Sequence, residues 1–273
     1  MNHVLDQSVA SASPTAASST GGELWAVSMA FVQRSVQRVR RMPSAFIPSL
    51  AMPVFQAIAF SGSFAAAVKF AGVKNSLDWF VPLAAIQGAS FGALGVSFGL
   101  ILDLQNGFFD RLRMAPLPRW SLVLGPVMAA LVRAIVPIVL VTTVGFLGGM
   151  NLPGGVAGLA MLAVAAMSIA YITASFGIGL TYRMRSMAAA ALMQFAIFMT
   201  IFLSSAQMPL AAMRGWAHSV ARINPMTNVL RMARQGFLGD VTWHDTWPGL
   251  LAIAGLGLAS TIWARRGLNS FDD

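Results

Sequence analysis

The sequence contains no cysteine and only three histidines, His3, His218 and His244, which lie far apart. Without thiols there is no disulfide and no cysteine nucleophile, and the scattered histidines lack the spacing of a metal site. No G-x-x-x-x-G-K-S/T sequence occurs, so the chain has no P-loop with which to bind and hydrolyse ATP. We therefore expect no metal, no cofactor and no enzymatic activity in this chain.

Charge is also scarce. Only 10% of the 273 residues are charged, whereas 57% are hydrophobic, and an ordinary soluble domain carries roughly a quarter charged residues. Each long apolar run approaches or exceeds the ~20 residues that cross ~30 Å of hydrocarbon. We therefore predict an all-α membrane protein with six transmembrane helices. The apolar runs lie near residues 46–68, 82–102, 122–148, 156–181, 187–206 and 248–264.

The segment before the first run is polar. Residues 1–22 are rich in Ser and Thr and lack the pattern of a signal peptide, so we expect a disordered cytoplasmic tail. Residues 23–42 mix apolar and basic side chains at helical spacing, which predicts an amphipathic helix in the membrane interface. A solvated, charged approach to the first span is the alternative. The transmembrane domain is expected over residues 43–268, with a short cytoplasmic tail at 269–273.

The basic residues predict the topology, because cytoplasmic loops carry an excess of Lys and Arg. With the N-terminus inside, eleven basic residues are cytoplasmic and six are outside, which favours a multi-pass cell-membrane protein with both termini cytoplasmic. The net charge of +9 then requires no nucleic acid as a partner. The cytoplasmic set is Arg34, Arg38, Arg40, Arg41, Arg111, Arg113, Arg119, Arg183, Arg185, Arg265 and Arg266, and the outer set is Lys69, Lys74, Arg214, Arg222, Arg231 and Arg234.

Four polar side chains fall within predicted spans. Gln56, Gln87 and Gln194 should face protein or a cavity rather than lipid, and each is a candidate for the transport pathway or for hydrogen bonding between helices. Arg133 would lie ~18 Å along its helix if the helix starts near Ser121. Three roles are open for Arg133: pairing with Asp103, holding a polar or anionic substrate group, or anchoring the helix.

Small residues recur along the second predicted span at spacings of four, three and four. They lie on one helical face, which predicts the close approach of a neighbouring helix. These residues are Gly88, Gly92, Gly95 and Gly99.

A polar segment separates the second and third predicted spans. Asp103 leads through Asn106-Gly107, a turn signal, into a short amphipathic stretch that Pro116 and Pro118 end. A short helix with aromatic and arginine side chains is suited to docking into a groove of another protein. The alternative is an ordinary positive-inside loop whose aromatic rings lie among lipid headgroups.

The stretch from Met208 to Gly239 is too polar to span a membrane simply, yet it carries regularly spaced apolar residues. It predicts two short amphipathic helices broken at Asn224-Pro225. An outer lid and an interfacial anchor are both consistent with this pattern.

Two motifs together resemble the ABC transporter type 2 permeases, and most closely their daunorubicin-resistance, drug-exporting branch. The resemblance covers about residues 24–268. One motif is Asp103-Leu104-x-x-Gly107-x-x-Asp110-Arg111-x-Arg113-x-x-Pro116-x-x-Arg119, followed by Leu124-Gly125. The other is Pro209-Leu210, then Trp216, Ile223-Asn224-Pro225-Met226-Thr227, Arg231 and Gly236. Many members have a proline shortly before the tryptophan, where this chain has Arg214-Gly215.

The resemblance implies how such a chain works. Two six-helix permeases, identical or related, face each other in the membrane, and each docks a cytoplasmic P-loop subunit that binds ATP and Mg. The outer segment with Trp216, Asn224, Pro225 and Arg231 would form a re-entrant helical hairpin before the sixth span. The docking helix between the second and third spans would present Asp110, Arg111, Leu112, Arg113, Pro116 and Arg119.

The function implied is the membrane-spanning subunit of an ATP-driven exporter in contact with membrane lipids. Because the predicted pathway has few charges, we expect an amphipathic or lipophilic substrate such as an antibiotic or a lipid. Export of a polysaccharide or lipid-linked glycan is the alternative within the same fold. An ATP-independent carrier or channel and a membrane scaffold are the alternatives of other classes.

Overall fold

The structure is a computed structural model that describes residues 21–272 except residues 42, 71 and 108–117. Within these residues the regular elements are helical throughout, as the composition predicted. The expected tail over residues 1–20 and the coupling helix lie outside the described residues. The elements are α1 (Gly21–Arg41), α2 (Pro43–Ser63), α3 (Ala65–Phe70), α4 (Ser76–Gln105), α6 (Ser121–Leu147), α7 (Gly155–Met184), α8 (Ala188–Phe202), η1 (Leu210–Ala212), α9 (Gly215–Ile223), α10 (Pro225–Leu238) and α11 (Trp243–Asp272).

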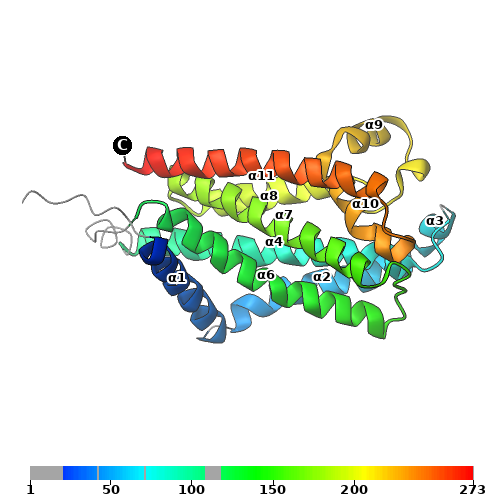
Figure 1. Cartoon of the computed structure of the whole chain (residues 1–273), viewed down its shortest axis with the longest axis horizontal. Coiled ribbons are helices and arrows are strands. Elements are labelled where there is room, and N and C mark those ends of the chain that lie inside the picture. Colours follow the sequence, from blue (N-terminus) through cyan, green and yellow to red (C-terminus); the bar gives the residue numbers. More distant parts are fainter. Residues whose placement is uncertain (1–20, 42, 71, 108–117, 273) are drawn as a thin grey trace, which may run out of the picture.

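The long helices lie along one common axis (Figure 1). At one end lie α1 and the C-terminal end of α11, and we call this the α1 end. At the opposite end lie α3 and the hairpin formed by α9 and α10, and we call this the hairpin end. The chain passes back and forth between the two ends, so the basic residues predicted to be cytoplasmic on α1 and α11 share one end of the molecule.

Each predicted span overlaps a helix, but the first span, 46–68, is divided between α2 and α3. Four helices, α4, α6, α7 and α11, are long and apolar enough to cross a membrane. The apolar helix of the fifth window, predicted over 187–206, ends at Phe202, and α2 contributes a shorter apolar stretch, Leu50–Ser63. At 15 residues, α8 is only ~22 Å long.

The two ends of the chain also differ from the expected boundaries. Helix α1 begins at Gly21, two residues inside the expected tail. Helix α11 continues through Asp272, so residues 269–272 are helical instead of a separate tail. The last turns of α11 are held against α7, because Gly267 lies directly on the backbone of Gly179.

Helix α4 is the centre of the bundle. In its most apolar 18-residue stretch 78% of the residues are buried, against 33% in α6 and α7 and 22% in α11. It packs against α2, α6, α7, α8 and α10. The other long helices therefore keep one apolar face outward, as expected of helices that contact lipid.

The glycine face of α4 receives helix α6, as the spacing predicted. A Cβ at Gly88 would lie 2.8 Å from Cβ of Pro137, and a Cβ at Gly92 would lie 3.4 Å from the carbonyl oxygen of Arg133. The remaining two glycines make room for arginine side chains, because a Cβ at Gly95 or Gly99 would meet the guanidinium of Arg133 or Arg38.

A second close approach joins α7 to α10. A Cβ at Gly158 would lie 2.7 Å from Cα of Gly236, and the amide of Gly154 donates a hydrogen bond of 2.8 Å to the carbonyl of Gly236. Only glycine permits this contact, because the obstructing atoms belong to backbone rather than to a movable side chain. The hairpin is thereby fixed to the bundle.

We predict that Gly158→Ala destabilises the protein although alanine is the better helix former. The new methyl must push two backbones apart, and overpacking of this kind costs about 1–3 kcal/mol. Gly255→Ala on α11 is the matched control, because nothing lies within 4 Å of a Cβ there. Thermal unfolding in detergent should show a lower Tm for Gly158→Ala and an equal or higher Tm for Gly255→Ala. Equal behaviour of the two variants would contradict the packing argument.

Candidate functional site

An ion-pair cluster ties α1 to the last turn of α4. Oδ1 of Asp103 accepts hydrogen bonds of 2.8 Å from Arg34 and from Arg38, which are one helical turn apart on α1. The Asp103 side chain is largely buried, at 11% exposure, so this charge depends on its arginine partners. The carboxylate that was a candidate partner for Arg133 thus binds two arginines of α1.

Arg133 lies deeper on the same side of α4. Its guanidinium sits over Gly95 and 5.1 Å from the centre of the Phe46 ring on α2, and its Nε has no hydrogen-bond partner among the described residues. Together with Arg34, Arg38 and Asp103 it lines a cavity of about 30 Å³, the size of one water molecule. Three guanidinium groups face one carboxylate here, so the cluster is electropositive.

The segment predicted to dock another protein is held at both of its ends. On one side α4 ends at Asn106, and Gly107 adopts a left-handed φ of 66°, which confirms the predicted turn. On the other side the hydroxyl of Ser121 donates to the carbonyl of Pro118 at 2.6 Å. Tyr182 of α7, which is fully buried, donates to the carbonyl of Leu122 at 2.7 Å.

Of the predicted docking residues, only Arg119 is described. It is exposed, and its carbonyl accepts from the amide of Leu122 in the turn that begins α6. Because both attachment points are at the α1 end, the segment between them starts and finishes on the same side of the bundle as α1. The other docking candidates, Asp110, Arg111, Leu112, Arg113 and Pro116, lie outside the described residues.

The three glutamines predicted within spans have different environments. Gln56 and Gln87 are buried inside this chain. Neither amide atom of Gln87 has a hydrogen-bond partner among the described residues, and the same is true of Nε2 of Gln56. Gln194 instead lies exposed on the outer face of α8. A single exposed amide on an otherwise apolar helix is unfavourable against lipid, which makes this face of α8 a candidate contact or pathway surface.

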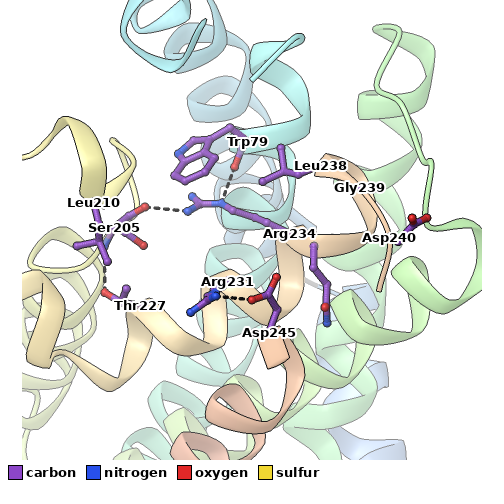
Figure 2. Close-up of a pocket in the computed structure, with 11 residues that line it drawn as sticks. Trp79, Ser205, Leu210, Thr227, Arg231, Arg234, Leu238, Gly239, Asp240 and Asp245 are labelled. Carbon is purple, nitrogen blue, oxygen red and sulfur yellow. Dashed lines mark hydrogen bonds and ion pairs between the residues drawn. The ribbon is translucent and has the colours of Figure 1, made fainter. Parts of the chain in front are cut away.

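At the hairpin end, Arg234 of α10 is buried and donates to three carbonyl groups, of which those of Trp79 and Ser205 are drawn in Figure 2. Its Nε donates to the carbonyl of Trp79 at 2.9 Å, and its two terminal nitrogens donate to the carbonyls of Ser205 and Ala206, each at 2.7 Å. The guanidinium also stacks on the ring of Trp79, 3.8 Å from its centre. One side chain therefore joins α10, the start of α4 and the segment that follows α8.

This contact explains why α8 ends early. The backbone after Phe202 leaves the helix, and its buried carbonyls need donors from elsewhere in the chain. Arg234 provides two of these donors, and Nε1 of Trp79 donates a further hydrogen bond of 3.1 Å to Ala206. The span predicted from hydropathy extends to residue 206, four residues beyond the end of α8. Hydropathy cannot show that the backbone there leaves the helix and finds hydrogen-bond donors on other helices.

The Asn224-Pro225 break is confirmed, and each residue around it has a structural role. The side chain of Asn224 caps α10 by accepting from the amide of Met226 at 2.9 Å, and its Nδ2 donates to the carbonyl of Thr200 at 2.8 Å. Pro225 occupies the first turn of α10, where a missing N–H costs nothing. The hydroxyl of Thr227 bridges α9 to Ser205, since it donates to Ala221 and accepts from the amide of Ser205.

A pocket of about 380 Å³ opens beside Arg234 (Figure 2). Arg231 forms an ion pair with Asp245 at its edge, and Gln235 binds Thr242 and Thr246 at the start of α11. Trp216, in contrast, lies on α9 with 73% of its surface exposed. Of the hairpin candidates, Asn224, Pro225 and Arg231 therefore contribute to one connected structure, whereas Trp216 faces outward.

Sequence reasoning missed Arg234, which it counted only as an outer charge. A signal was present: the neighbouring positions on one face of the helix, Leu230, Ala233 and Phe237, are apolar and buried. An arginine among such residues is buried unless its side chain leaves the face, and a buried guanidinium requires acceptors.

We predict that Arg234→Met strongly destabilises the protein. The variant removes three hydrogen bonds to buried carbonyls, and the carbonyl of Ala206 keeps a second donor, Nε1 of Trp79. Each buried group that loses its partner costs about 1–3 kcal/mol. Arg231→Met is the matched control, one turn away on α10, where the arginine is 48% exposed and its ion pair contributes at most ~1 kcal/mol. Unfolding in detergent should show a large decrease in Tm for Arg234→Met alone; similar decreases for both variants would overturn the assignment.

Comparison with known proteins agrees with these features. A family model described as ABC-2 type transporter matches residues 27–238. The daunorubicin resistance ABC transporter permease protein DrrB1 of Streptomyces coeruleorubidus is 24% identical over 258 residues, which are 93% of this chain and 87% of that protein. The putative transport permease ycf38 of Pyropia yezoensis is 25% identical over 224 residues, 80% of this chain and 75% of that protein.

A further relative, the probable multidrug ABC transporter permease YbhR of Escherichia coli strain K12, is 25% identical over 195 residues, 69% of this chain and 52% of that protein. The family match extends from α1 to the end of α10 and so includes both the Asp103 cluster and the Arg234 network. The chain is a membrane subunit of an ABC transporter and belongs to the ABC-2 type transporter family.

Proposed function

We propose that this chain is the permease of an ATP-driven exporter and that a separate cytoplasmic P-loop subunit docks on the segment between α4 and α6. The proposal rests on the hydrogen bonds that fix the helices on both sides of this segment. Asp103 with Arg34 and Arg38 holds its entry, and Ser121 with Tyr182 holds its exit. A segment held in this way can transmit a push to two long helices at once.

The α1 end is assigned to the cytoplasm. Arginines predicted to be inside lie on α1, at the end of α7 and on the last turns of α11, all toward that end of the bundle. The corresponding membrane is the cell membrane, with six passes made by α2, α4, α6, α7, α8 and α11. ATP and Mg would bind the partner subunit, and this chain would have no catalytic role.

Helices α4 and α6 are suited to carry the movement. Their backbones are in close contact along the glycine face, so a displacement of the segment that joins them would move both together. The start of α4 is in turn bound to the hairpin through Arg234 and Trp79. A change at the docking site would therefore reach the hairpin, which we propose dips into the outer leaflet as a re-entrant gate.

The proposed substrate is an amphipathic or lipophilic compound, either a drug-like molecule or a lipid. The names of two relatives support this class, since one is a daunorubicin resistance permease and another a probable multidrug permease. The exposed Gln194 face of α8 supports a working unit of two permeases, identical or related, with the pathway between them. A glycan exporter of the same fold is the second candidate.

We predict that the chain purifies from native membranes with a P-loop ATPase at near-equal stoichiometry and that Arg111→Glu/Arg113→Glu abolishes this association. Reversal of two charges in the docking segment should disrupt an interface anchored by arginines. The matched control is Lys69→Glu/Lys74→Glu, which reverses two exposed charges at the hairpin end. Mass spectrometry of the purified complexes provides the measurement.

Retention of the ATPase by the Arg111→Glu/Arg113→Glu variant would place docking elsewhere. Absence of an ATPase from wild-type preparations in several mild detergents would instead support a self-sufficient carrier or a scaffold. Efflux by cells depleted of ATP distinguishes these two, because a carrier continues until the ion gradient is collapsed, whereas a scaffold transports nothing.

A further inference from the structure

A long apolar crevice lies between α8 and α11. Both helices pack against α7, and the space between them has a volume of about 360 Å³. Ile169, Ile172 and Phe176 of α7 form its floor, while Ile197 of α8 and Trp263 of α11 stand on opposite walls. The volume is within the ~300–1,000 Å³ range of ligand pockets.

The walls of the crevice offer few groups to a polar ligand. The hydroxyls of Ser90, Thr200 and Ser260 each donate to a carbonyl of their own helix, at 3.0, 2.8 and 3.0 Å. These three donors are therefore already used. Thr173 adds one further hydroxyl, and the rest of the lining is aliphatic and aromatic. Such a crevice favours an alkyl chain over a sugar or a charged molecule.

One end of the crevice has the opposite character. Arg183 stacks on the ring of Trp263, with its guanidinium carbon 3.6 Å from the ring centre. Nη1 of Arg183 and Nε1 of Trp263 are both buried, and neither has a hydrogen-bond partner among the described residues. Nε1 of Trp263 lies against Gly179, whereas the Arg183 side chain is only half-buried. The cation that stacks on this ring can therefore be reached by an acceptor from outside the bundle.

The two parts have a definite order along the bundle. Arg183 lies in the last turn of α7, at the α1 end, whereas Met226 at the far end of the crevice begins α10, at the hairpin end. A ligand that fills both parts would place its anionic group toward the α1 end and its apolar chain toward the middle of the bundle. A phospholipid in the leaflet at the α1 end has this orientation.

We propose that this crevice binds one acyl chain of a resident anionic phospholipid whose phosphate accepts hydrogen bonds from Arg183. The charge of Arg183 selects an anionic headgroup with free acceptor oxygens. The site requires only that the chain is embedded in a membrane, so it does not depend on the proposed ATPase or export.

The test is native mass spectrometry of the purified, delipidated full-length chain, titrated with phosphatidylglycerol or with phosphatidylcholine of identical acyl chains. Wild type should prefer phosphatidylglycerol. Arg183→Gln removes the charge and should weaken phosphatidylglycerol binding about tenfold, as loss of a charge-assisted hydrogen bond does. It should not change phosphatidylcholine binding.

Arg266→Gln is the matched control, because it removes an exposed arginine from α11 at the same end of the bundle. It should change the preference less than twofold, and all variants should keep the wild-type Tm to within a few degrees. A preference that survives in Arg183→Gln overturns the proposal, as does an equal loss in Arg266→Gln.

The acyl chain is tested separately from the phosphate. Ala259→Trp fills the crevice from α11 and should weaken binding of phosphatidylglycerol, whereas glycerol phosphate without acyl chains should bind at least tenfold more weakly than the lipid. Undiminished binding in Ala259→Trp, or equal affinity for glycerol phosphate, would reduce the site to an anion site and overturn the lipid assignment. Loss of dimer in Ala259→Trp with lipid binding intact would identify a second copy as the occupant and also overturn it.

Discussion

The need to satisfy buried backbone polar groups dominates the hairpin end of this protein. A helix satisfies its own backbone, but the chain after α8 is irregular, and the carbonyls of Ser205 and Ala206 belong to buried residues. The guanidinium of Arg234 answers this need because its donors lie in a fixed plane and can reach three carbonyls at once. A lysine would present one compact charge and could not join the same three segments in this geometry.

Helix α4 connects this network to the opposite end of the bundle. Trp79 in its first turn contacts Arg234, and Asp103 in its last turn binds the two arginines of α1. Between these points the helix is buried and packs through glycines against α6. Contacts of this kind change by discrete repacking rather than by smooth bending. A displacement at one end is therefore transmitted along a stiff element rather than absorbed within it.

Hydropathy and small-residue spacing were sufficient to predict α4, α6, α7 and α11, because each depends on one long apolar run. The break at Asn224-Pro225 was also readable, since proline and a capping asparagine act locally. The pairing of Asp103 with Arg34 and Arg38 and the burial of Arg234 were not readable. Arg38 and Asp103 are 65 positions apart in the sequence, and Arg234 and Trp79 are 155 positions apart. Composition cannot show such contacts, because it assigns every arginine the same charge wherever it lies. The early end of α8 was missed for the same reason, because its partner is on α10.

Glycine explains how so many arginines fit within an apolar bundle. The guanidinium of Arg38 lies against Gly99, and that of Arg133 lies against Gly95. The ring of Trp263, on which Arg183 stacks, lies against Gly179. In each case the missing Cβ leaves a recess in a neighbouring helix. A long cationic side chain placed in such a recess keeps its apolar stem packed while its head meets a carboxylate, a ring or a ligand. The glycine pattern of α4 and α7 therefore does more than bring helices together: it decides where charge can be held, at the α1 end of the bundle and along the crevice beside α11.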